Sequence, residues 1–282
     1  MKGAAQRWVV AGLAGIALML RAGGACAADV TDNDRLFRNF TRETATVSDG
    51  QVRLEIQGMK EQDDGNARLN VTGLRLRNVF PGHTPDTVSA GVINLVGAYG
   101  VTKTIEAGMV IPALSESVRF TDRSTVNSAD IGDLLLYTKF RRPVAEHCDI
   151  GGGVEITMPN GPEHNGLGTG EFGVNPVVST RYQRGPYSMG INAGYQIYQG
   201  DAVDVFNYGA DVIVRGGESY ALRTEIAGRV FSTGGKRFSD LTVLPGVDFN
   251  LTHNVLFRPT GMAGATGSAL DWGVGAGMAV MF

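Results

Sequence analysis

Residues 271–282 read DWGVGAGMAVMF, and this stretch decides the fold class. Its even-numbered positions, from Trp272 to Phe282, carry apolar side chains, whereas its odd-numbered positions are mostly glycine, with Asp271, Ala279 and Met281. An apolar face that recurs every second residue is typical of a β-strand. The end of the chain therefore predicts a strand with one apolar face and one small or polar face.

The same period of two runs backward through the chain. It is clear at 241–252, 206–215 and 187–198, and weaker elsewhere. Strands are predicted at 67–79, 88–99, 104–111, 133–142, 149–158, 173–184, 187–198, 206–215, 219–231, 241–252, 254–264 and 271–282.

The connections between these strands alternate in length. Tight turns are predicted at 100–103, 143–147, 185–186, 216–218 and 252–254, and longer loops at 112–132, 159–172, 199–205, 232–240 and 264–269. Short turns at one end and long loops at the other are typical of a transmembrane barrel. The prediction is an all-β, antiparallel up-and-down transmembrane β-barrel of about 12 strands, with both termini in the periplasm. A soluble β-sandwich explains the alternation but not the connection lengths.

Aromatic residues of the apolar face fall near the two strand ends. Such rings favour membrane interfaces, so two aromatic belts around an aliphatic band fit a bilayer. The belt predicted at the short-turn end holds Phe140, Tyr182, Tyr187, Tyr220, Phe249, Phe257 and Phe282, and the other holds Tyr195, Phe206 and Trp272.

Composition and the first residues set the context. The chain has 282 residues, 40 of them glycine, and a formal net charge of −3, which leaves no basic surface for a nucleic-acid partner. Residues 1–28 combine Lys2 and Arg7, the apolar run WVVAGLAGIALML and the small-residue site around Cys26. They are predicted to be a cleaved signal peptide, which implies export to the outer membrane of a Gram-negative bacterium. The alternative for Cys26 is a lipoprotein cysteine.

The domain organisation follows from these features. Residues 67–282 are predicted to be the outer-membrane barrel. Residues 29–66 are more polar and leave three alternatives: a further strand, because Val52, Leu54 and Ile56 alternate, a periplasmic arm, or a plug inside the barrel.

Four short motifs occur in order along the chain: ADIGDLLLYTKFRR at 129–142, GVEITMPNG at 153–161, GLGTG at 166–170 and GINAGY at 190–195. In this order they resemble a family of porin-like outer-membrane transporters named for meta-cleavage phenol-degradation pathways. Asn160 departs from the residue that is commoner in that family, and residues 28–66 match nothing in it. The resemblance implies an uptake channel for small, often apolar or aromatic solutes, and it supplies no catalytic or binding residues.

Motifs for enzymatic chemistry are weak. GTGEFG at 168–173 fits the G-x-G-x-x-G pattern, but it lies between two predicted strands rather than before a helix, so a loop is expected. The four histidines have no metal-ligand spacing, and neither cofactor nor metal is expected. A membrane-embedded lipid-modifying enzyme is the enzymatic alternative, and Ser188, Ser219, His147 and His253 lie near predicted turns.

The charged residues of the strands fall on the non-apolar face, so they are predicted to point into the lumen. The candidates are Lys139, Arg141, Asp149, Glu155, Arg181, Asp211, Arg215, Arg223, Glu225 and Arg229, and Asp248 falls on the same face. The turns predict Arg141 opposite Asp149, and Asp211 near Arg223 or Glu225. Two interpretations stay open: pairs that satisfy one another in a plugged lumen, or a polar pore lining that sets selectivity. In the second, Arg181, Arg223 and Arg229, with Asp211 and Glu225, form the wall of a constriction.

The predicted function is a non-enzymatic outer-membrane channel for passive uptake of small solutes, including hydrophobic or aromatic compounds. The alternative is a barrel without an open pore, acting as an adhesin, a scaffold or a lipid-modifying enzyme. The predicted partners are outer-membrane lipids, small-molecule solutes and, through the strand that ends in Phe282, the barrel-assembly machinery.

Overall fold

The structure is a computed structural model, and it describes residues 46–64, 85–162, 167–200, 204–233, 236–266 and 271–282. All regular elements in these ranges are β-strands, which confirms the predicted all-β class. Within the same ranges, no helix is long and apolar enough to cross a membrane. The predicted signal peptide at 1–28 and the predicted strand at 67–79 lie outside the described residues.

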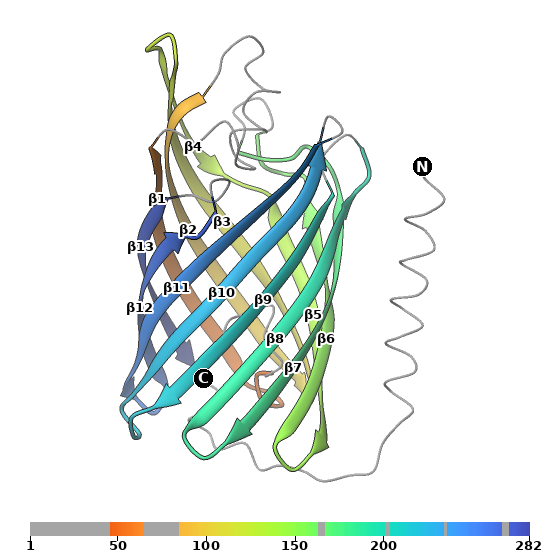
Figure 1. Cartoon of the computed structure of the whole chain (residues 1–282). Helices are drawn as coiled ribbons and strands as arrows, with labels where there is room; N and C mark the ends of the chain where they lie inside the picture. Colours follow the sequence, from red (N-terminus) through yellow and green to blue (C-terminus); the bar gives the residue numbers. More distant parts are fainter. Residues whose placement is uncertain (1–45, 65–84, 163–166, 201–203, 234–235, 267–270) are drawn as a thin grey trace.

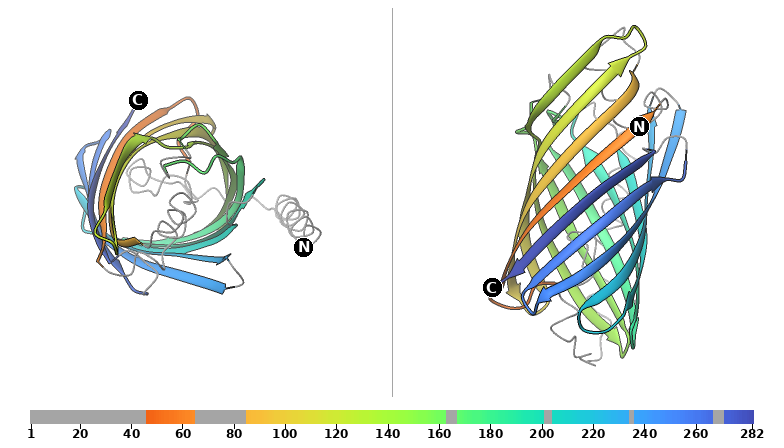
Figure 2. Two further views of the ribbon diagram at one scale, coloured as in Figure 1. Left: turned by 90° about the horizontal axis from the view of Figure 1, so that it is seen from above. Right: turned by 90° about the vertical axis from the view of Figure 1, so that its left-hand side faces the viewer.

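The strands form a closed antiparallel barrel, seen from the side in Figure 1 and along its axis in the left view of Figure 2. Apart from β4 and β5, which both pair with β3, neighbours along the chain pair with each other, and the ring closes where β1 pairs with β13. The strands are β1 (Val52–Asp64), β2 (Pro85–Thr102), β3 (Ile105–Phe120), β4 (Thr125–Ile131), β5 (Leu134–Ala145), β6 (Cys148–Met158), β7 (Gly173–Arg184), β8 (Tyr187–Tyr198), β9 (Val205–Arg215), β10 (Tyr220–Thr233), β11 (Lys236–Thr252), β12 (Val255–Gly264) and β13 (Trp272–Met281).

The thirteen strands make a twelve-stranded wall because β4 and β5 share one position in the ring. Both pair with β3, β4 along its second half and β5 along its first half. The predicted strand number is therefore confirmed.

The first wall strand comes earlier in the chain than residue 67. One of the alternatives left open for residues 29–66 was a further strand, and Val52–Asp64 forms one. Its Ile56 pairs with Met278 on one side and with Leu95 on the other. The barrel wall thus begins at Val52 among the described residues. The outer face of β1 carries Val52, Leu54 and Ile56, the same alternation of apolar side chains that β8 and β13 show.

The barrel is apolar outside and charged inside, in the register predicted from the alternation. Ile191 and Val274 are 59% and 57% exposed on the outer surface, whereas Arg181 and Asp248 are buried inside. A soluble sandwich would bury the aliphatic face, because exposed apolar area is unfavourable in water. This inverted distribution is the one that suits a lipid surrounding.

The tight turns and the aromatic side chains gather at the predicted ends. Gly185 and Gly217 adopt positive φ values of 57° and 126° in two of these turns, a conformation that favours glycine. Of the predicted belt residues, Phe140 is half-buried and the others are exposed: Tyr182, Tyr187, Tyr195, Phe206, Tyr220, Phe249, Phe257, Trp272 and Phe282.

Two of the predicted long loops are instead extensions of the strands. Residues 112–132 hold the second half of β3, a turn and β4, and most of 232–240 belongs to β10 and β11. The tall β3–β4 hairpin stands above the rest of the wall in Figure 1. These segments carry polar residues on both faces, such as Ser115, Glu116 and Ser117, so a search for apolar alternation does not detect them.

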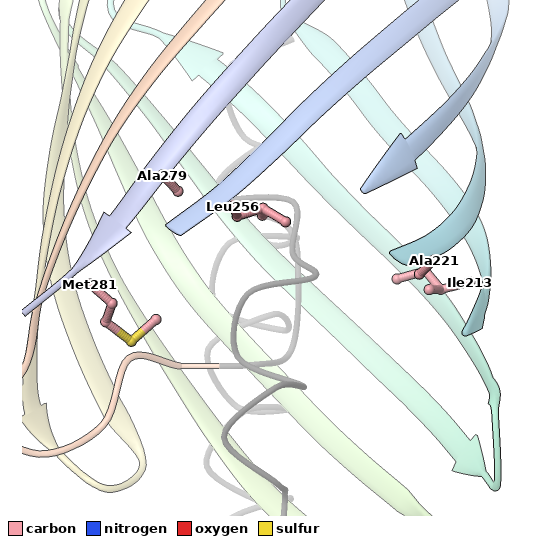
Figure 3. Packing of buried hydrophobic residues seen from close by; sticks show 5 residues of the cluster. All are labelled: Ile213, Ala221, Leu256, Ala279 and Met281. Carbon is pink, nitrogen blue, oxygen red and sulfur yellow. The ribbon is translucent and has the colours of Figure 1, made fainter. Parts of the chain in front are cut away.

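The short-turn end holds the last residue of the chain and the start of β1. The backbone N–H of Phe282 donates to Val52 O at 2.9 Å, and Val52 N–H donates to Phe282 O at 3.1 Å. Inward-facing apolar residues of β9, β10, β12 and β13 cluster near this end, as Figure 3 shows: Ile213, Ala221, Leu256, Ala279 and Met281. The inner wall therefore has an apolar patch at this end, beside charged residues such as Arg141 and Asp149.

Candidate functional site

The inner wall holds a buried carboxylate, Glu106 on β3, that collects several donors. Glu106 is 0% exposed. Its Oε1 accepts hydrogen bonds from Tyr137 Oη at 2.9 Å and from Arg53 Nη2 at 3.3 Å, and it lies 3.4 Å from Lys139 Nζ. Its Oε2 accepts the backbone N–H of Val47 at 2.6 Å. Burying this charge is tolerable because both oxygens are paired with donors.

From Glu106 the ion pairs continue around the wall. Arg53 lies 3.9 Å from Glu55, which lies 3.9 Å from Arg258 on β12. Arg258 and Arg223 both approach Asp248, at 3.2 and 3.3 Å. Arg223 also reaches Glu225 at 3.2 Å and donates to Thr260 Oγ1 at 2.8 Å. The network joins four bases to four acids, so it is balanced in formal charge: Arg53, Lys139, Arg223 and Arg258 with Glu55, Glu106, Glu225 and Asp248.

Two of the predicted candidates form a separate pair on β7 and β9. Arg181 Nη2 lies 3.0 Å from both carboxylate oxygens of Asp211, and Arg181 Nη1 donates to Ser188 Oγ at 2.6 Å. Asp211 is opposite Glu225 in the backbone register, as predicted, but its carboxylate turns to Arg181.

The remaining candidates lie nearer the two ends of the barrel. Arg141 pairs with Asp149 at 2.8 Å across the β5–β6 turn, which confirms that contact. Arg229 pairs with Asp240 at 2.6 Å. Arg215 donates to Gly185 O at 3.5 Å at the short-turn end.

The five residues proposed for one constriction are distributed over three ion pairs. Arg181 holds Asp211, Arg223 holds Glu225, and Arg229 holds Asp240. Asp211 and Glu225 are direct partners in the register of β9 and β10, so four of the five residues lie side by side, whereas Arg229 lies further along β10. The alternation predicts the face of each residue, and the register of neighbouring strands determines its partner.

Sequence reasoning left several inner-wall residues out of the candidate set. Arg53 and Glu55 belong to the segment whose fold was left open, and Glu106 lies in a strand with weak alternation. Asp240 and Arg258 follow the inward positions of β11 and β12. The available signal was the strand periodicity, which places all five on the non-apolar face.

Parts of three sequence motifs meet around the carboxylate of Asp133: residues 132–133, 160–161 and 167–170. Asp133 Oδ1 accepts the backbone N–H of Gly161 at 2.9 Å, and Oδ2 accepts both the N–H and the Oγ1 hydroxyl of Thr169 at 2.7 Å. Asn160 Oδ1 accepts the Leu134 N–H at 2.7 Å, so residue 160 takes part in the same contact. We call Asp133, Gly161 and Thr169 the Asp133 clasp.

Close backbone approach explains the glycines of the clasp. A Cβ on Gly168 would lie 2.5 Å from the Gly161 carbonyl oxygen and 2.8 Å from Asp133 Oδ1. Leu167 beside it is buried. The clasp therefore holds the loop between β6 and β7 against the start of β5, and GTGEFG at 168–173 lies in a loop and the first residue of a strand.

The residues before β1 lie against the inner wall at the short-turn end. Val47 packs with Val96, Ala98, Val110 and Tyr137. A Cβ on Gly100 would overlap the Ser48 carbonyl, so only glycine admits this contact. Residues 46–48 thus narrow the lumen beside β2 and β3.

The interior contains a cavity of about 520 Å³. Its acids are Glu61, Asp133, Glu155 and Glu225, and its bases are Arg223 and Arg258. Apolar side chains complete much of the lining, among them Met59, Val92, Val110, Leu135, Pro112 and Leu244. The arrangement can accommodate a small molecule that has both an apolar and a polar part.

The described residues offer little for catalysis or metal binding. They contain no group of three or more His, Cys, Asp or Glu side chains arranged to hold a metal ion. Ser188 Oγ is held by Arg181, and His147 packs edge-on against Tyr182. Within the same ranges, no serine is hydrogen-bonded to a histidine.

Comparison with solved structures identifies the fold. The COG4313 outer membrane channel from Pseudomonas putida F1 superposes with a TM-score of 0.65 and 12% identity, over 87% of this chain and 100% of that one. The fold is that of an outer-membrane β-barrel. The translocator domain of autotransporter NalP from Neisseria meningitidis gives a TM-score of 0.54 at 10% identity, over 89% and 92% of the two chains. The NanC porin gives 0.52 at 10% identity, over 80% and 98%.

No protein-family profile matches the chain, and no curated protein matches it. The resemblance to the family named for phenol-degradation pathways therefore stays a prediction. What the structure adds is that three of the four motifs behind that resemblance are in contact through the Asp133 clasp.

Proposed function

We propose that this chain is an outer-membrane channel through which small solutes diffuse passively. The observation that carries the proposal is the inner wall, where a charge-balanced network and a cavity of about 520 Å³ lie inside an apolar outer surface. Burying these charges is tolerable because they are paired, and charged side chains in the lumen of a barrel can act on passing solutes.

The fold does not choose between a channel and other barrel functions, because both porins and an autotransporter domain share it. The interior favours the channel. A barrel that served only as an anchor could fill its interior with apolar side chains, but here charged side chains from β1, β6, β10 and β12 border open space. Solute uptake is therefore the function that the site supports best.

The dimensions and lining of the cavity suggest the class of solute. A volume of about 520 Å³ lies within the range of roughly 300–1,000 Å³ that small-molecule sites occupy. Leu135, Val110 and Leu244 give the lining an apolar side, which suits hydrophobic or aromatic compounds with a polar group. This is also the solute class that the family resemblance implies.

Placement in the cell follows from the same proposal. The signal peptide directs export, the short turns face the periplasm, and the long-loop end faces outward. Phe282 is 67% exposed on the outer face and ends the last wall strand, where it is available to the barrel-assembly machinery.

Liposome swelling tests the proposal. Liposomes that contain the refolded protein should admit small neutral solutes such as arabinose, at rates that fall steeply with solute size. They should also admit small aromatic alcohols. Liposomes that contain heat-unfolded protein are the control. Swelling no faster than in this control for every solute would overturn the channel function.

A further inference from the structure

Glu155 on β6 is a buried carboxylate that the ion-pair network does not include. It is 6% exposed and lines the cavity. Its Oε2 accepts a hydrogen bond of 2.6 Å from Asn175 Nδ2, across the β6–β7 pairing. Its Oε1 has no hydrogen-bond partner among the described residues.

The absence of a counter-charge distinguishes Glu155 from the buried acids Glu106, Asp211 and Asp248. Glu106, Asp211 and Asp248 each lie within 3.4 Å of an arginine or lysine nitrogen. Glu155 has no such base within ion-pair distance in the part of the chain that the structure describes, and its bond to Asn175 comes from a neutral amide. A buried, incompletely satisfied carboxylate is a group that an external cation or donor would complete.

The side chains that line the cavity include more acids than bases. Four carboxylates line it against two guanidinium groups. Arg223 and Arg258 are both already paired with Asp248, which is 0% exposed. Asp133 is satisfied by the three donors of the clasp. The uncompensated charge that a ligand meets here is therefore negative, and Glu155 contributes to it.

The surroundings of Glu155 suggest what the cation carries. Leu135 and Val110 line the same cavity, and the backbone register places Leu135 two residues from Tyr137, the direct partner of Glu155. An inorganic ion would gain nothing from these side chains, whereas an apolar group attached to an ammonium would bury its surface against them.

We propose that the cavity is a binding site for small amphipathic organic cations, with the ammonium at Glu155 and the apolar part along Leu135 and Val110. The site rests on the proposed channel function and defines the solutes for which the channel is selective. A charge-assisted hydrogen bond is stronger than a neutral one, so the cation should bind at least about tenfold more tightly than a neutral analogue.

The test compares three probes that share a phenyl ring: 2-phenylethylammonium, 2-phenylethanol and phenylacetate. Their affinities for protein refolded in a non-ionic detergent are measured by isothermal titration calorimetry. The ammonium should bind at least about tenfold more tightly than the alcohol, and phenylacetate should bind most weakly. Glu155→Gln should remove the preference for the ammonium. The matched control is Glu146→Gln, because the Glu146 side chain is 86% exposed in a turn, and it should keep the preference.

Equal affinity of the three probes for the wild-type protein would overturn the proposal, even if the variant failed to fold. An unchanged preference in Glu155→Gln would also overturn it. Binding is measured without flux, so the two proposals separate. If the protein binds the ammonium but conducts no solute, the channel function is contradicted and the binding site still stands. If it conducts solutes but shows no preference among the probes, only the binding site is contradicted.

Discussion

Replacing Asp133 with asparagine should release the loop between β6 and β7. The Asp133 carboxylate accepts three hydrogen bonds, from Gly161 N–H at 2.9 Å and from Thr169 N–H and Oγ1 at 2.7 Å. The variant keeps the shape of the side chain, but it loses the charge and one of the two acceptor oxygens.

The size of the effect follows from these three bonds. A hydrogen bond to a charged group contributes about 1.5–3 kcal/mol when it is buried. Asp133 is only half-buried, so water competes for its oxygens and each bond contributes less. The remaining amide oxygen still accepts one donor. We therefore expect the variant to weaken the docked loop by about 2 kcal/mol, which raises the undocked population about thirtyfold.

Hydrogen–deuterium exchange measures that population directly. Local opening controls amide exchange, so the Gly161 and Thr169 amides should exchange about thirtyfold faster in Asp133→Asn than in the wild-type protein. Asp130→Asn is the matched control, because Asp130 Oδ1 accepts only the N–H of the adjacent Ile131, at 2.8 Å. Unchanged exchange at Gly161 and Thr169, or an equal increase in the control, would refute the role assigned to the clasp.

Three further predictions test the barrel and its inner wall. Glu106→Gln leaves Arg53 and Lys139 without their shared carboxylate and should lower the free energy of unfolding by about 3–5 kcal/mol. The barrel should then unfold at a lower temperature in heat-modifiable gel migration, whereas the control Glu218→Gln, in an exposed turn, should not shift that temperature. Ile191→Arg places a charge on the lipid face and should destabilise the folded barrel by about 2–4 kcal/mol, measured from the folded fraction in liposomes. Asn192→Arg, on the inner face, should fold, and an equal loss of folded protein in both variants would contradict the assigned faces. The double variant Arg223→Ala, Arg229→Ala leaves Glu225 and Asp240 without these partners, and it should shift the reversal potential in a KCl gradient toward cation selectivity. An unaltered reversal potential would show that the pore runs elsewhere or is closed.

The membrane-facing part of the barrel could be predicted from the sequence because lipid imposes a regular pattern. The strand predicted at 187–198 is β8, and that at 271–282 contains β13, each with the predicted face outward. In the second half of β3 the polar run Ser115, Glu116 and Ser117 interrupts the alternation. The sequence therefore predicts a loop where the structure has the second half of β3 and the whole of β4.

The lumen could be predicted only as a face. Alternation shows that Arg181 and Asp211 point inward, but their contact joins β7 to β9 across β8, and it depends on the stagger of three strands. Glu106 meets Arg53 and Val47 at sequence separations of 53 and 59 residues, and the contact with Arg53 joins β1 to β3 across β2. No local signal contains that information. Contacts across a tight turn, such as Arg141 with Asp149, could be predicted from the sequence.

Single-channel recording of the refolded wild-type protein in a planar lipid bilayer tests the central claim most directly, because it asks whether the charged lumen conducts. Discrete current steps in KCl, absent from the bare bilayer and from bilayers with heat-unfolded protein, are the predicted result. A protein that migrates as a folded, heat-modifiable barrel but produces no current steps would contradict the account.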